Sequence, residues 1–181
     1  MGFFKSGENV FEENSGNKYV KIGWQQQVEQ SLGIKDLTNF GYISGYKDSA
    51  DDLVEKTFSN EMYIYPVVFL YRQYLELLLK NIIAKMPKED QYKGELHNLK
   101  KMWAHISKVF KREKLIAKKQ LKKVEDVVLA FHKVDPKSSN FRYFFKFKNK
   151  LTIDKKMVVD VRLMQSKINE VDTILYATYG I

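Results

Sequence analysis

YPVVFLYRQYLELLLKNIIA, residues 65–84, is one of the most apolar stretches of the chain, yet it carries three charged residues at regular intervals. Arg72, Glu76 and Lys80 are four residues apart, so an α-helix places them on one narrow face. Apolar residues fill the rest of the circumference, which is typical of a buried helix. Charges on a buried helix are costly unless they are paired or face a cleft. The stripe therefore predicts either an internal ion-pair ladder or a functional site, and the sequence leaves both open.

Two prolines indicate where this helix begins and ends. Pro66 fits the first helical turn and disfavours helix in the residue before it. Pro87 follows Met86 at the other end. The predicted helix has about twenty residues and a length of roughly 30 Å, so we expect it to be the spine of the domain.

The remaining sequence predicts a mainly α-helical bundle of four to five helices with a small β-hairpin. Hydrophobic periodicity places helices over 49–62, with Ser49 as N-cap, and over 95–112, 115–133 and 160–179. Gly41 and Gly45 are expected in a turn. Alternating aromatic and basic residues predict the hairpin near 141–153. We expect residues 1–22 to form a loosely ordered arm, with a short helix over 24–34, and residues 23–181 to form one helical bundle domain.

Composition narrows the class of protein. A chain of 181 residues is the length of one domain. The absence of cysteine excludes disulfides, thiolate metal sites and cysteine nucleophiles, and it fits a reducing compartment. The longest apolar run falls far short of the ~20 residues that a membrane span requires. We therefore expect a cytoplasmic protein that does not enter the membrane.

Sequence spacing favours neither a metal nor a bound cofactor. The three histidines are scattered, and no Asp-x-Asp or His-x3-His pair supplies metal ligands. No glycine-rich phosphate loop is present either. We expect no metal and no cofactor.

Positive charge is concentrated in one segment. Residues 100–150 hold sixteen of the 31 Lys and Arg residues but four of the 22 Asp and Glu residues. Such a block is the electrostatic footprint of a protein that binds RNA, DNA or an acidic partner. A solvated, lysine-rich pair of helix faces is the alternative.

Four motifs in a fixed order resemble a branch of the HEPN superfamily (higher eukaryotes and prokaryotes nucleotide-binding). They are Tyr65-P-x3-L-Y-R-x3-E-L-x2-K, His97-N-L-x3-W, Asp135-P and Phe141-R-Y, and the likeness covers roughly residues 42–178. The resemblance implies a helical bundle, a homodimer with its working surface at the dimer cleft, and metal-independent endoribonuclease activity in a bacterial or phage defence or toxin–antitoxin system. Many members use an Arg-x4-6-His motif, which this chain lacks: Lys100-x4-His105 is its nearest approximation.

The candidate site combines the stripe with the histidine that precedes the third long helix. A short loop after Pro87 is expected to reverse the chain, which would place His97 beside the C-terminal part of the spine, closer to Lys80 than to Arg72. We assign Arg72, Glu76 and His97 to catalysis, with His97 as general acid or base and Arg72 stabilising phosphate charge. The residues expected to contact nucleic acid or nucleotide are Lys80, Asn98, Lys100, Lys101, Arg142 and Lys146.

A second hypothesis gives the same residues a purely structural role. Glu76 before Lys80 is the favoured orientation of an ion pair on a helix, and Arg72 can extend it. The chain would then be a non-catalytic dimerising or nucleotide-binding module, or the partner of an antitoxin or defence protein. RNA, a second copy of the chain and such a partner protein therefore remain the three candidate partners.

Overall fold

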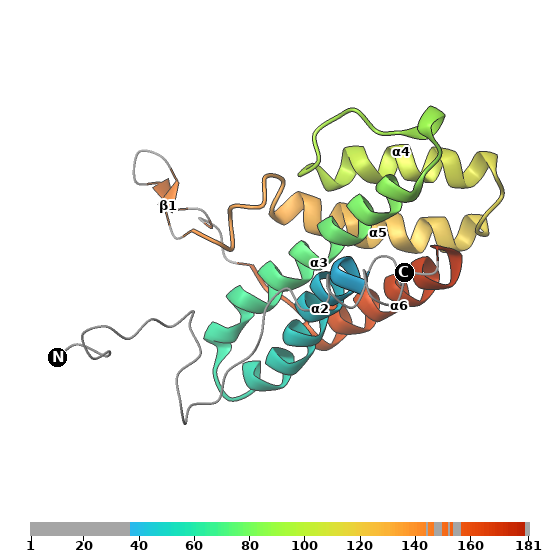
Figure 1. Cartoon of the computed structure of the whole chain (residues 1–181). Coiled ribbons are helices and arrows are strands. Elements are labelled where there is room, and N and C mark those ends of the chain that lie inside the picture. Colours follow the sequence, from blue (N-terminus) through green and yellow to red (C-terminus); the bar gives the residue numbers. More distant parts are fainter. Residues whose placement is uncertain (1–36, 144, 147–149, 152, 154–156, 180–181) are drawn as a thin grey trace, which may run out of the picture. The chain divides into compact units, whose positions relative to one another are not determined.

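The computed structural model describes residues 37–143, 145–146, 150–151, 153 and 157–179 (Figure 1). The chain divides into two compact units, Met1–Thr38 and Asn39–Ile181. The elements described below belong to the second unit, except that the first described helix begins at Leu37, in the first unit. The predicted arm over 1–22 and the predicted helix over 24–34 lie outside the described residues.

The described residues form a helical bundle, which confirms the mainly α-helical prediction. Two 3₁₀ turns, Glu61–Tyr63 and Lys88–Asp90, lie on either side of the predicted spine helix. None of the helices in the described part of the chain is long and apolar enough to span a membrane. The α-helices are α2 (Leu37–Thr57), α3 (Ile64–Lys85), α4 (Leu99–Arg112), α5 (Lys118–Val134) and α6 (Val161–Tyr179).

Two short strands lie in the region of the predicted hairpin. Strand β1 is Phe145–Lys146 and β2 is Lys150–Leu151, and they pair in antiparallel fashion, with Phe145 opposite Leu151. Phe141, where the predicted hairpin begins, lies in a turn. Residues 147–149 lie outside the described part, so a hairpin over the full range 141–153 stays a prediction.

Helix α2 begins twelve residues before the predicted N-cap Ser49 and ends before Met62, so both predicted ends were wrong. Gly41 and Gly45 lie within the helix rather than in a turn. A Cβ atom at Gly45 would meet no atom within 4 Å, so no tight turn requires glycine there. Burial of Ile43, Ala50 and Val54 on one face stabilises the helix across both glycines.

The path from α3 to α4 differs from the predicted reversal. His97 precedes α4 and contacts Arg72 in the middle of α3, whereas Arg112 at the end of α4 binds Asp90, just beyond the end of α3. The two helices therefore run in the same general direction (Figure 1). The connecting segment returns along α3 because Gln91 donates to the carbonyls of Ile83 and Met86.

The buried core lies between α3, α4, α5 and α6, and Ile43, Ala50 and Val54 of α2 belong to it as well. Helix α4 packs against α3 and α5, whereas α5 packs mainly against α4 and α6. The apolar stripe of α5 is thus covered by its two main neighbours. Trp103 and Phe110 of α4 are buried and meet edge to face, with ring centroids 6.3 Å apart.

Polar bonds also tie α2 and α6 to α3. The hydroxyl of Tyr71 and the amide of Gln165 both donate to Asp51 Oδ1, over 2.6 and 3.0 Å. Tyr74 donates to Asp172 Oδ1 over 2.6 Å. Burial first, and then the carboxylate partner, raises the pKa of each tyrosine, so both stay protonated donors. These bonds hold α2 and α6 to α3, the helix that carries the charged stripe.

Candidate functional site

The three charged residues of α3 form a continuous ladder centred on Glu76. Arg72 Nη1 donates to Glu76 Oε2 over 2.7 Å, and Lys80 Nζ donates to Glu76 Oε1 over 2.7 Å. The side chains of Arg72 and Glu76 are 0% and 4% exposed, whereas that of Lys80 is 29% exposed. The ladder therefore runs from the core toward the surface.

Arg72 fixes two distant segments of backbone to α3. Its Nε donates to the carbonyl of Asp135 over 3.1 Å, and its Nη2 donates to the carbonyl of His97 over 2.7 Å. Because its guanidinium is fully buried and bonded to three partners, Arg72 can act on a ligand only by positioning other groups.

His97 joins the ladder, and Arg72, Glu76, Lys80 and His97 together form the cluster. Its most accessible member is His97. Its Nδ1 lies 2.7 Å from Glu76 Oε1, while its side chain is 71% exposed. An ionised carboxylate can only accept hydrogen bonds, so Nδ1 carries the proton. In the neutral imidazole, Nε2 is then left free to accept a proton from a ligand.

The charge state of Glu76 follows from its partners. Burial alone would raise the pKa of Glu76, but hydrogen bonds from Lys80 and Arg72, with their charges, outweigh it and hold that pKa below its ordinary value. Glu76 is therefore ionised at neutral pH and orients the His97 ring.

Asp135 and His132, at the C-terminal end of α5, are the residues that the sequence did not assign to the site. Asp135 is fully buried, and its Oδ1 accepts the backbone N–H groups of Ser139 and Asn140. That turn presents the Asp135 carbonyl to Arg72. Burial, followed by the charges of Lys100 and Arg72, lowers the pKa of His132. No local spacing signals this proximity, because about 60 residues separate the segments.

The residues expected to bind nucleic acid divide into three groups. Lys80, Lys100 and Lys101 lie on or beside the cluster, and the last two are exposed in the first turn of α4. Asn98 caps α4 by accepting Lys101 N–H over 3.0 Å. The guanidinium of Arg142 stacks on the Tyr143 ring. Within the described residues, no hydrogen bond links Arg142 to the ladder. Lys146 is in β1, and its side chain is not described.

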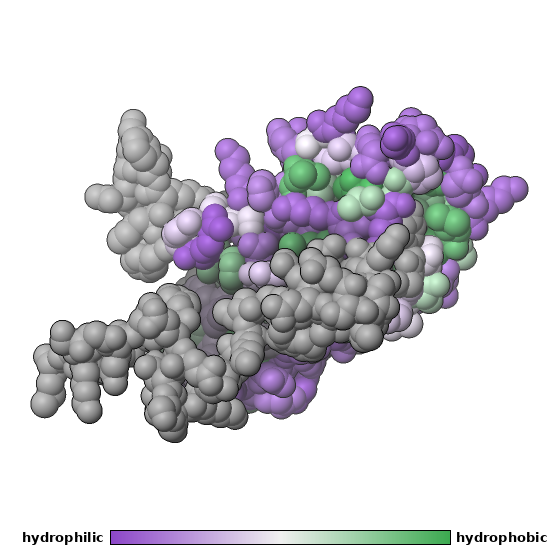
Figure 2. All heavy atoms as spheres, in the orientation of Figure 1, coloured by the Kyte–Doolittle hydropathy of each residue, from purple (hydrophilic) through white to green (hydrophobic). Residues whose placement is uncertain are grey.

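Exposed lysines follow the lengths of α4 and α5, and Lys100 and Lys101, in the first turn of α4, are the ones that follow His97 directly. Figure 2 shows hydrophilic side chains, with hydrophobic ones between them, over the region where α4 lies in Figure 1. On α5, Lys122 and Lys123 are already paired with carboxylates, those of Asp126 and Glu170. The exposed lysines of the two helices are Lys100, Lys101, Lys108, Lys111, Lys118, Lys119, Lys122 and Lys133.

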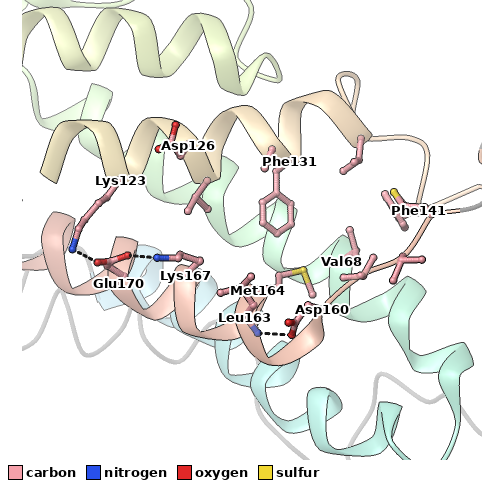
Figure 3. A pocket seen from close by; sticks show the side chains of 16 residues that line it. Val68, Lys123, Asp126, Phe131, Phe141, Asp160, Leu163, Met164, Lys167 and Glu170 are labelled. Atoms are coloured by element: carbon pink, nitrogen blue, oxygen red, sulfur yellow. Dashed lines mark hydrogen bonds and ion pairs between the residues drawn. The ribbon is translucent and has the colours of Figure 1, made fainter. Parts of the chain in front are cut away.

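A separate groove of about 530 Å³ lies between α5 and α6 (Figure 3). Phe131 and Met164 point into it from the two helices, and Val68 of α3 lines its floor. At its rim, Lys123 and Lys167 both bind Glu170. The groove is thus mainly apolar, and these rim charges are already paired with one another.

Comparison of the chain with protein-family models, curated proteins and solved structures found no match. Among the described residues, no group of three or more His, Asp and Glu side chains is placed to hold a metal ion. The functional argument therefore depends on the geometry of the cluster and on the charge beside it.

Proposed function

We propose that the chain is a HEPN-like RNA-binding protein that cleaves RNA without a metal, in a bacterial or phage defence or toxin–antitoxin system. The observation that carries the proposal is the exposed His97 ring, held through Nδ1 by the buried carboxylate of Glu76. A base oriented by a carboxylate is a recurrent arrangement for proton transfer. The order of the motifs and the exposed lysines that follow the ring along α4 support RNA as the substrate.

The proposed reaction uses the 2′-hydroxyl of RNA as nucleophile. His97 Nε2 accepts the hydroxyl proton, O2′ bonds to the neighbouring phosphorus, and the bond from phosphorus to O5′ breaks, with the leaving oxygen taking a proton from water. Lys80 and Lys100 offset the charge that develops on the phosphate. Arg72 and Glu76 hold His97 in place, since neither side chain is open to a ligand.

Cleavage of labelled tRNA and mRNA in EDTA tests this proposal. His97→Ala should abolish cleavage and leave the fold intact, because the ring is exposed. His105→Gln is the matched control: His105 lies within α4, with Nε2 against the Asp90 carbonyl, and its replacement should preserve cleavage. Cleavage that survives His97→Ala would reject the assigned site. Failure to cut any RNA would reject the proposed cleavage and leave RNA binding as the proposed function.

The groove between α5 and α6 favours a second candidate, a dimerising module in which the ladder is purely structural. Leu163 and Val158 line this groove and are 53% and 98% exposed, so a second copy of the chain could cover them. Light scattering after size-exclusion chromatography measures the molar mass in solution and so tests for the dimer. Leu163→Glu should convert a dimer to a monomer, whereas Tyr176→Glu, on α6 outside the groove lining, should not. A monomeric parent chain would remove this candidate.

A further inference from the structure

A second cavity, of about 400 Å³, lies between α2 and α3 on the side of the ladder that Lys80 occupies. Its volume is within the range of small-ligand pockets. Tyr42 and Ile43 of α2 form one wall, and Leu77, Lys80 and Asn81 of α3, with Ala84, form the other. The cavity belongs neither to the His97 contact nor to the groove between α5 and α6.

Three features of this cavity suit a nucleobase. Tyr42 is 59% exposed and offers an aromatic face on which a base can stack. Asn81 lines the cavity with an amide that can both donate to and accept from a base edge. Leu77 and Ile43 supply apolar contacts for the ring.

Asn81 supplies the polar group of this cavity wall. The residue is 7% exposed and lines the cavity, so packing between the helices holds its amide in place. A base edge that enters the cavity would exchange hydrogen bonds with that amide in place of water.

The cavity is also joined to the proposed reaction centre. Lys80 lines it and donates to Glu76 Oε1, the same oxygen that lies 2.7 Å from His97 Nδ1. A base in the cavity would therefore place its phosphate beside Lys80 and His97. We infer that the cavity takes one unstacked base of single-stranded RNA, next to the bond that His97 addresses. This inference rests on the proposed function.

The test compares a single-stranded RNA hexamer with a ribose-phosphate hexamer that has no bases. We expect the parent chain to prefer the first, and Tyr42→Ala to weaken binding of RNA alone, by about 5- to 150-fold in Kd. Tyr42→Trp should restore the preference because it restores the aromatic face. Tyr65→Ala, which replaces another exposed tyrosine outside this cavity, should leave both affinities unchanged.

The outcomes separate this inference from the function on which it rests. Salt-dependent binding that is equal for the two hexamers, or that Tyr42→Ala does not alter, overturns the base pocket alone. Failure to bind either hexamer overturns both proposals. Binding of AMP as tight as that of RNA, and equally dependent on Tyr42, would reassign the cavity to free nucleotides and overturn its role in RNA binding.

Discussion

Arg72 joins three segments of the chain through one buried guanidinium, and its removal should be costly. Arg72→Ala eliminates the ion pair with Glu76 and leaves the carbonyls of His97 and Asp135 without their donor. Breaking a buried pair by removing one partner typically costs about 3–5 kcal/mol. We expect a loss of that size in the free energy of unfolding, measured by urea denaturation.

Arg162 provides the control for Arg72, because it is an arginine whose ion pair is exposed rather than buried. It also forms a double hydrogen bond with a carboxylate, that of Glu55, but both side chains are exposed. Exposed pairs contribute little to stability, so Arg162→Ala should cost far less than Arg72→Ala. Equal losses in the two variants would show that the buried ladder does not stabilise the fold.

Glu76 should make stability depend on pH in acid. Its pKa is lowered in the folded chain, so the stabilisation is fully present above the ordinary value of 4.5 and is lost as the pH falls through the lower folded value. Glu76→Gln removes this titration. The difference in stability between the parent chain and Glu76→Gln should therefore be large at pH 7 and shrink below about pH 4.5. A constant difference down to pH 3 would contradict the assignment.

The charged ladder was predictable from the sequence, whereas its connections were not. Arg72, Glu76 and Lys80 meet because helical spacing alone brings them together. The carbonyls that Arg72 also binds belong to residues 25 and 63 positions away, and backbone carbonyls carry no sequence signal. The sequence therefore left open whether the charged face forms an internal ladder or meets a ligand, and the structure buries its first two members.

Among the elements, several helix ends were predicted to within one residue: α4 ends at Arg112, α5 ends at Val134, and α6 runs over Val161–Tyr179. Pro66 lies in the first turn of α3, which ends at Lys85 as Pro87 suggested. The glycines of α2 were misleading, because burial of its apolar face outweighs their cost of roughly 1 kcal/mol each. Helix α4 begins four residues later than predicted because Asn98, rather than a residue near Glu95, adopts the capping conformation.

Helix capping gives a paired prediction for α4 and α5. Asn98 caps α4 through Lys101 N–H, so Asn98→Ala should lower the free energy of unfolding by about 1 kcal/mol. Ala117 occupies the N-cap of α5, where Gln120 already accepts the Ala117 N–H. Ala117→Ser should complete that capping box and raise stability. Thermal melting of both variants checks the opposite signs, and a shift in the same direction would reject the capping assignments.

For the whole molecule, the relative direction of α3 and α4 could not be read from the sequence. A connection of about a dozen residues can either reverse the chain at once, which makes α4 antiparallel to α3, or run back along α3, which makes the two helices parallel. Gln91 holds the connecting segment against the end of α3, and the bond of Arg112 to Asp90 fixes the second path. The bond with Arg112 exists only once α4 is packed. The consequence is functional, since this path brings His97 to Arg72 and Glu76 in the middle of α3.

Salt dependence distinguishes a basic surface that contacts phosphate from one that is merely solvated. If the surface binds single-stranded RNA, affinity should fall steeply with salt, and each lost phosphate contact should reduce the log–log slope by about 0.7. The double variant Lys100→Ala/Lys101→Ala, beside His97, should reduce the slope by up to about 1.4. The matched pair on α5, Lys122→Ala/Lys123→Ala, should change the slope less, because carboxylates of Asp126 and Glu170 already hold both ammonium groups, whereas in the first pair Lys101 alone has such a partner among the described residues, Glu95. Equal effects of the two variants would place RNA across both helices rather than at the start of α4, and a flat salt response of the parent chain would reduce the lysines to a solvated surface.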